Sequence, residues 1–139
     1  MKLRINTTTV ANFVMAVEPY SSEQLQHLLL NNSVKESLLL IDCRSFLEYN
    51  SGHISAAHNV HCPPIVKRRA AGSLSLQNIL RDAESRSRFL SGQYSNIVVY
   101  DDRTVDLQCL SADSILLMVL KGLTEHLTGS GIHYLAGEF

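Results

Sequence analysis

The chain has 139 residues, of which 45% are hydrophobic and 18% charged, and its formal net charge is −1. This length fits one domain that can bury roughly two-thirds of its unfolded surface, and the composition excludes a disordered tail. A net charge so close to zero excludes a chain-wide electrostatic attraction to nucleic acid or to a membrane surface.

The apolar run at residues 10–17 is too short to span a bilayer and lacks the pattern of a cleaved signal peptide. Three cysteines are an odd number without a C-x-x-C pair, which predicts reduced thiols in an intracellular protein. We therefore expect no membrane partner and a location in the nucleus and/or the cytoplasm. Residues 1–17 are expected to form an N-terminal extension, in part disordered.

A first helix is predicted soon after this extension. Ser21 can cap it, Gln24 stands three residues later as in a capping box, and Leu25, Leu28 and Leu29 form an apolar stripe. The two asparagines that follow the stripe end the helix.

Three short apolar runs, at residues 37–42, 96–100 and 131–135, predict strands buried on both faces. Helical patterns at 45–50 and 112–123 lie between them. Strands that alternate with helices favour an α/β fold with a parallel sheet covered by helices on both sides. Ligands of such sheets bind at the carboxyl ends of the strands, so the loops after these three strands are the ones to examine.

The loop after the first strand carries the most specific pattern. It reads DCRSFLEYNSGHISAAHN (residues 42–59), or D-x-R-x3-E-x3-G-H-I-x2-A-x-N. Asp42 brings a charge to the sheet edge, and Arg44 and Glu48 can pair across one helical turn for about 0.3–0.5 kcal/mol. Gly52 is expected to permit a tight turn before the chain returns to the core.

This pattern resembles the opening segment of rhodanese-type domains. The runs IVVYD and HYLAGEF follow in the order expected of that family, so the resemblance covers residues 18–139. It implies a rhodanese-like three-layer α/β/α domain with a mainly parallel central sheet.

An active rhodanese needs a cysteine thiolate in the loop after the IVVY strand, where backbone N–H groups lower its pKa. This chain has DDRTVDL there, and Asp101, Asp102 and Asp106 supply negative charge without a nucleophile. Cys109 stands nine residues after Tyr100, too late for that loop. The sequence therefore predicts the fold without sulfur transfer and without a cofactor.

A second loop, HCPPIVKRR at residues 61–69, has the spacing of a cysteine-phosphatase loop between Cys62 and Arg68. Such a loop surrounds phosphate with backbone N–H groups, but Pro63 and Pro64 remove two of them. Arg69 also stands where a hydroxyl residue is expected. We interpret the spacing as a coincidence; an active sulfurtransferase, or a small cysteine phosphatase that uses Cys62, is the alternative.

The same stretch has three consecutive cations, Lys67, Arg68 and Arg69, then a small spacer, then Leu74 and Leu76. Cations followed by a hydrophobic-x-hydrophobic pair resemble the docking peptides of mitogen-activated protein kinases. In an extended segment the cations meet an acidic patch and the leucines enter apolar pockets. The competing interpretation is a solvated basic loop whose leucines pack in the domain's own core.

A rhodanese-like domain that carries such docking cations resembles the N-terminal domain of dual-specificity mitogen-activated protein kinase phosphatases, in their inducible nuclear branch. In that family the domain is a catalytically inactive rhodanese fold that recruits the kinase, and a separate C-terminal domain dephosphorylates it. The kinase-binding residues that the resemblance implies are Val66, Lys67, Arg68, Arg69, Leu74 and Leu76.

The chain ends at Phe139, where that family continues into a catalytic domain. We therefore expect residues 18–139 to be a docking domain without phosphatase activity of its own. The expected partner is a mitogen-activated protein kinase and not nucleic acid, because the cations are too few and interleaved aromatics are absent. No metal is expected, because His53, His58, His61 and Cys62 lack the spacing of a closed zinc site.

Overall fold

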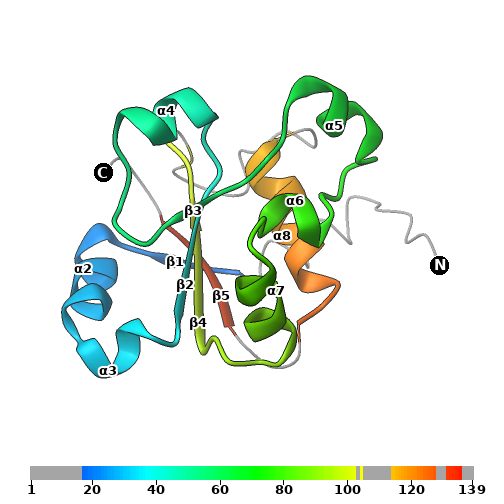
Figure 1. The fold of residues 1–139 in the computed structure, drawn as a ribbon. Helices are drawn as coiled ribbons and strands as arrows, with labels where there is room; N and C mark the ends of the chain where they lie inside the picture. The colour runs from blue at the N-terminus through cyan, green and yellow to red at the C-terminus, as the bar shows by residue number, and fades with distance from the viewer. Residues whose placement is uncertain (1–16, 103, 105–113, 128–130, 136–139) are drawn as a thin grey trace.

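A computed structural model describes residues 17–102, 104, 114–127 and 131–135 of the chain. Five strands form one sheet in the order β1-β5-β4-β2-β3, and every neighbouring pair is parallel (Figure 1). The strands are β1 (Glu18–Tyr20), β2 (Leu38–Asp42), β3 (His58–Asn59), β4 (Asn96–Tyr100) and β5 (Gly131–Leu135). All their carboxyl ends therefore meet at one edge of the sheet, as the sequence predicts.

Helices cover both faces of this sheet, which confirms the three-layer α/β/α architecture. They are α2 (Ser22–Leu30), α3 (Asn32–Lys35), α4 (Phe46–Ser51), α5 (Pro64–Arg69), α6 (Leu76–Ile79), α7 (Ala83–Leu90) and α8 (Ile115–Thr124). Residues of α6, α7 and α8 are buried against one face, and residues of α2 and α4 pack against the other.

Alternation along the strands divides the apolar residues between two core layers. In β2, Leu39 and Ile41 face the layer with α8, and Leu40 faces the layer with α2. In β4, Val98 likewise faces α2. Because both faces are covered, four consecutive residues of each strand are apolar, and this is why their sequences predict them so directly.

The predicted helix after Ser21 is confirmed together with its cap. The Ser21 hydroxyl accepts from the Gln24 N–H at 3.1 Å, and the Gln24 side chain accepts from the Ser21 N–H at 2.8 Å. The helix ends at Leu30, immediately before the two asparagines. The strands predicted at 37–42, 96–100 and 131–135 are also present, within a residue of the predicted bounds.

Two edge strands had no signal in the sequence. β1 has three residues with Pro19 in the middle, and β3 consists only of His58 and Asn59. Neither is an apolar run, because an edge strand has only one neighbour and is partly exposed.

The predicted N-terminal extension at 1–17 lies outside the described residues except for Val17, which is buried in the core. Among the described residues, no helix has both the length and the apolar content to cross a membrane.

Candidate functional site

The carboxyl edge of the sheet is organised by one buried carboxylate. Asp42 is fully buried at the end of β2 and accepts from the Arg44 guanidinium, with the closest N–O distance 2.8 Å. It also accepts from the Arg44 backbone N–H at 2.9 Å and from the Tyr100 hydroxyl at 3.0 Å. Hydrogen bonding to Asp42 raises the pKa of Arg44, while burial and the charge of Asp42 raise the pKa of Tyr100.

The predicted pair between Arg44 and Glu48 is wrong. Arg44 turns back to Asp42 and also donates to the Gly52 carbonyl at 2.6 Å. Glu48 instead accepts from the hydroxyl of Ser45, the N-cap residue of α4, at 3.1 Å. Asp42 is a stronger partner for Arg44 than Glu48 is. Asp42 is buried, so no water can take the place of the guanidinium, whereas Glu48 is exposed.

The role predicted for Gly52 is also wrong. Its φ of 166° is extended backbone that any residue adopts, and a Cβ added there would meet nothing within 4 Å. Gly52 contributes its carbonyl oxygen, which ties the end of α4 to Arg44.

The loop after β4 begins with a carboxylate that is engaged locally. Asp101 accepts from the backbone N–H and the hydroxyl of Thr104, at 2.7 and 2.8 Å. Burial raises the pKa of Cys43 well above its usual value, and the charges of Asp101 and Asp42 raise it further. Cys43 is therefore a structural thiol and not an activated one. The predictions for Asp106 and Cys109 lie outside the described residues.

Residues 61–69, HCPPIVKRR, do not form a loop that could surround a phosphate with backbone N–H groups. Pro63 is the N-cap residue of α5 and Pro64 its first residue, so the stretch from Pro64 to Arg69 is helical. Cys62 is half-buried, and burial raises the pKa of its thiol, with Lys67 acting in the opposite direction. A protonated thiol ahead of a proline-initiated helix is unsuited to nucleophilic attack, which opposes the alternative of catalysis by Cys62.

The three predicted docking cations occupy the last turn of α5. Lys67 is half-buried, and Arg68 and Arg69 are exposed. Within the described part of the chain, no carboxylate lies within ion-pair distance of Arg68 or Arg69. Cations at a helix C-terminus are favoured by the helix dipole, so Arg68 and Arg69 are stable here without a counter-ion from the described part of the chain.

The predicted apolar anchors differ in whether a partner could contact them. Leu74 is only 1% exposed and packs in the core, and its backbone N–H donates to the Met118 carbonyl of α8 at 3.1 Å. Leu74 cannot contact a partner in this structure, which corrects its assignment. Leu76, the first residue of α6, and Val66 of α5 are half-buried and pack on the same core.

The cations and the leucines do not share one extended segment, contrary to the expectation from the sequence. α5 ends at Arg69, the chain turns with φ of 52° at Ala71, and α6 begins at Leu76. Gly122 of α8 lies directly beneath, because a Cβ added to it would stand 2.1 Å from the Leu74 carbonyl oxygen. The turn after α5 is therefore fixed on α8.

The four residues considered as zinc ligands do not form a metal site. They are His53, His58, His61 and Cys62. His53 stacks on Tyr49 with ring centroids 3.7 Å apart, His58 lies in β3, and His61 is exposed. In the ranges that the structure describes, no three His, Cys, Asp or Glu side chains are placed to hold a metal ion.

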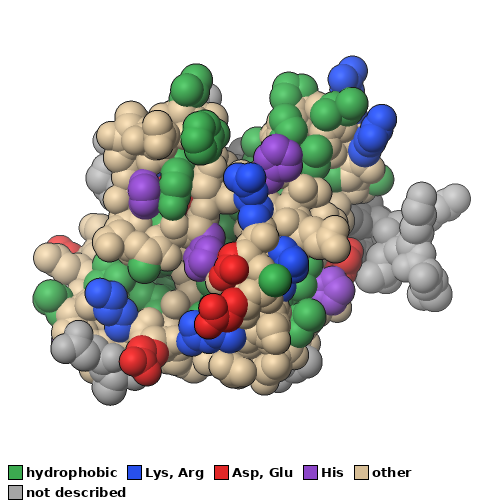
Figure 2. All heavy atoms as spheres, in the orientation of Figure 1, with side chains coloured by type: hydrophobic (Ala, Val, Ile, Leu, Met, Phe, Trp, Pro, Cys, Tyr) green, Lys and Arg blue, Asp and Glu red, His purple; other side chains and the backbone are tan. Residues whose placement is uncertain are grey.

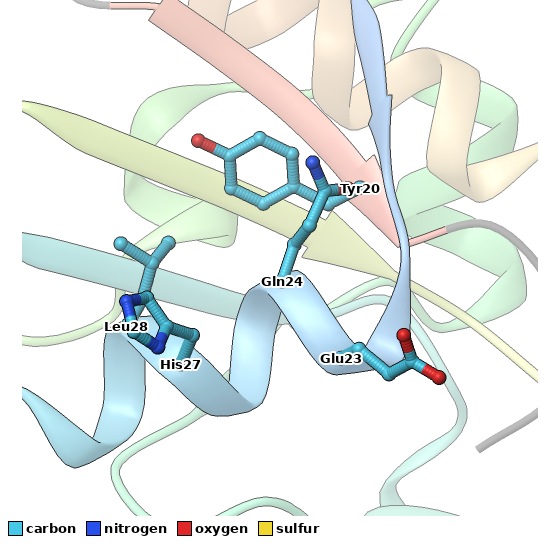
Figure 3. Close-up of a pocket in the computed structure, with 5 residues that line it drawn as sticks. All are labelled: Tyr20, Glu23, Gln24, His27 and Leu28. Carbon is cyan, nitrogen blue, oxygen red and sulfur yellow. The ribbon is translucent and has the colours of Figure 1, made fainter.

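A groove that the sequence did not indicate lies between the end of β1 and α2 (Figure 3). Its lining residues are Tyr20, Glu23, Gln24, His27 and Leu28. The Tyr20 ring stacks on His133 of β5, 4.0 Å between centroids. The groove contains a carboxylate and no lysine or arginine, so it does not suit an acidic partner.

Fold and motif together define a class of protein. Residues 21–137 match the Rhodanese-like domain family, so the chain belongs to the rhodanese-like domain family. The buried carboxylate edge and the loop pattern at 42–59 lie within the matched residues.

The chain is similar to dual specificity protein phosphatase 4 of Gallus gallus, with 42% identity over 102 residues. Dual specificity protein phosphatase 1-B of Xenopus laevis is 39% identical over 101 residues, and dual specificity protein phosphatase 4 of Homo sapiens 41% over 102. Each comparison covers 73% of this chain and 26 or 27% of the relative. The chain therefore spans about a quarter of the length of these curated relatives, in their N-terminal part. These comparisons confirm the resemblance inferred from the sequence.

Proposed function

We propose that this chain is a non-catalytic docking domain that binds mitogen-activated protein kinases through the cations of α5. Arg68 and Arg69 carry the proposal, because they are exposed and have no carboxylate partner in the described part of the chain. Such charges are available to the acidic docking patch of a kinase. In a longer phosphatase related to the curated relatives, docking would bring the kinase to a catalytic domain that dephosphorylates and inactivates it.

The surroundings of α5 support this proposal. Residues 65–88 contain six cations and two carboxylates, so this stretch is locally positive in a chain whose net charge is −1. Local charge of this kind attracts an acidic protein surface and increases the rate of association. The nuclear or cytoplasmic location stays a prediction from the cysteine pattern.

The test is a binding titration of the chain against an extracellular-signal-regulated, a p38 and a Jun N-terminal kinase. Arg68→Ala/Arg69→Ala should weaken capture by at least about tenfold, as expected when charged contacts at the centre of an interface are removed. Binding to the unaltered chain should weaken as salt rises, and the double variant should show a smaller salt dependence.

The matched control is Lys35→Ala/Lys121→Ala. It removes the same number of positive charges from positions outside residues 65–88, at the end of α3 and in the last turn of α8. Equal weakening by both double variants would mean that only net charge matters, and an unchanged affinity in Arg68→Ala/Arg69→Ala would refute the proposal.

Catalysis by Cys62 is tested separately. A thiosulfate-to-cyanide assay and a phosphotyrosine-analogue assay should show no turnover by the chain. Turnover that disappears in Cys62→Ser would overturn the non-catalytic assignment.

A further inference from the structure

Large apolar side chains are exposed on the two helices that stand at the carboxyl edge of the sheet. Phe46 is 63% and Leu47 78% exposed on α4, and Ile65 is 49% exposed on α5. Among the described residues, only Leu30 and Leu90 are comparable, and they lie on α2 and α7. Single exposed leucines are ordinary, whereas a group of apolar side chains on neighbouring elements indicates a contact surface.

The topology places α4 and α5 at the same edge of the sheet, after neighbouring strands. α4 follows β2 and α5 follows β3, and these two strands pair with Ile41 opposite His58 and Asp42 opposite Asn59. Both helices therefore rise from adjacent strand ends (Figure 1). Figure 2 shows a notch between these two projections, with hydrophobic side chains on both of them.

Hydrogen bonds fix the position of α4. The Arg44 guanidinium joins Asp42 before the helix to the Gly52 carbonyl after it, and the Tyr49 hydroxyl donates to the Ala57 carbonyl at 2.7 Å. The core-facing side of the helix is thus fixed by hydrogen bonds. Side chains on its outer side are presented on a preformed backbone, which lowers the entropy cost of binding.

On α5, apolar and charged side chains share one helix surface. Arg68 and Arg69 follow Ile65 by three and four positions, the spacing at which helical side chains are neighbours. A partner that contacts the two arginines therefore also meets Ile65. Leu74, one of the apolar anchors expected from the sequence, is buried and cannot contact the partner beside Ile65.

We propose that Phe46 and Leu47, together with Ile65, form the apolar part of a two-sided docking surface whose charged part is Arg68 and Arg69. The occupant is a folded protein with an acidic patch bordered by apolar side chains. Charge complementarity to α5 selects this occupant. The inference rests on the proposed function, in which the occupant is the kinase, and it adds that the kinase reaches across the notch to α4.

Energetics favour such a division of roles. Arginines that a partner covers contribute to affinity, whereas charge pairs left in water are screened and mainly steer association. Apolar side chains that become fully desolvated add to the affinity of such arginines. Exposed apolar residues on α4, across the notch from the charged helix, can supply this contribution.

The test is a titration of Phe46→Ser/Leu47→Ser against whichever kinase the chain binds most tightly. Affinity should fall at least about tenfold, the loss typical of buried apolar contacts in an interface. The slope of affinity against salt concentration should be unchanged, because no charge is removed. The matched control, Leu30→Ser/Leu90→Ser, removes two exposed leucines from other helices and should leave affinity within about twofold.

A second pair of variants, Leu47→Glu and Leu30→Glu, decides the matter if a double serine variant does not fold. A carboxylate at position 47 should weaken binding to an acidic partner strongly, and one at position 30 should not. Urea midpoints of all variants show that each one tested is folded.

Each combination of results separates this inference from the proposed function. If Arg68→Ala/Arg69→Ala weakens binding and the α4 variants do not, the two-sided surface is refuted and the proposed function stands. If the arginine variant binds normally, the proposed function itself fails. If the α4 variants alter only the sedimentation of the chain alone, the occupant is a second copy, and the inference is again refuted.

Discussion

Two groups of arginines in this molecule have opposite surroundings. Arg44 joins a fully buried carboxylate at 2.8 Å and a backbone carbonyl, and its side chain is 11% exposed. Arg68 and Arg69 lie in water at the end of α5, with no carboxylate at ion-pair distance among the described residues. The first arrangement contributes to the fold, whereas the second is available to a partner. Burial of the counter-ion thus distinguishes a structural arginine from one available for recognition.

Removal of the buried carboxylate is the largest perturbation that this comparison predicts. Asp42→Ala should lower the free energy of unfolding by about 3–5 kcal/mol, because it leaves Arg44 and the Tyr100 hydroxyl without their buried partner. Urea unfolding followed by circular dichroism measures the loss. Glu48→Ala, at an exposed carboxylate, should change stability by less than about 0.5 kcal/mol. A loss below about 1 kcal/mol in Asp42→Ala would mean that the buried cluster is not a main determinant of stability.

The contact beneath the turn after α5 predicts the next largest effect. Gly122→Ala would place a methyl group 2.1 Å from the Leu74 carbonyl oxygen and 2.8 Å from the Ile79 side chain. We expect a loss of about 1–3 kcal/mol, as for other overpacked sites. Gly52→Ala is the control, because its Cβ would meet nothing within 4 Å. Equal stability of the two variants in thermal unfolding would contradict the close contact.

The buried edge also predicts how stability depends on alkaline pH. Burial raises the pKa of the Cys43 thiol above its ordinary value of 9.0. As pH rises past this value, the folded chain therefore keeps a proton on Cys43 that the unfolded chain loses. The contribution of this proton to the free energy of unfolding is fully present below about pH 9 and declines as pH rises further. Urea midpoints at pH 7.5, 9 and 10 should fall in that order. The decline should be smaller in Cys43→Ala, and an identical decline in that variant would assign it to another group such as Tyr100.

The smallest effect on stability is expected at the docking cations. Arg68→Ala/Arg69→Ala should change the free energy of unfolding by less than about 0.5 kcal/mol, because exposed side chains without partners contribute little to folding. The same variant is expected to lose kinase binding. A destabilisation comparable to that of Asp42→Ala would show that the two arginine groups do not differ in the way described above.

Much of the fold follows from local patterns in the sequence. β2 and β4 are buried on both faces, so their apolar runs predict them clearly. Ser21 and Gln24 form a capping box that indicates the start of α2. The edge strands and the short helices α5 and α6 lack such patterns. Their conformations are set by neighbours distant in sequence, as when the Leu74 N–H donates to α8.

The features of the candidate site differ in how far the sequence reveals them. The cations proposed for docking are visible in the sequence, and so are the two prolines with which α5 begins. Which apolar residues are exposed cannot be read in the same way. Leu74 and Ile65 are both aliphatic, and only packing against Met118 and Gly122 hides the former. The partner of Arg44 was missed for a similar reason, since burial of Asp42 decides the competition with Glu48.

The exposed arginines of α5 have a consequence for how such a domain diversifies. Since Arg68 and Arg69 are exposed and have no carboxylate partner among the described residues, we expect substitutions there to carry little risk of misfolding. The proposed docking surface at α5 can therefore acquire a different partner without loss of the fold, whereas Asp42 and Gly122 are expected to tolerate substitution poorly.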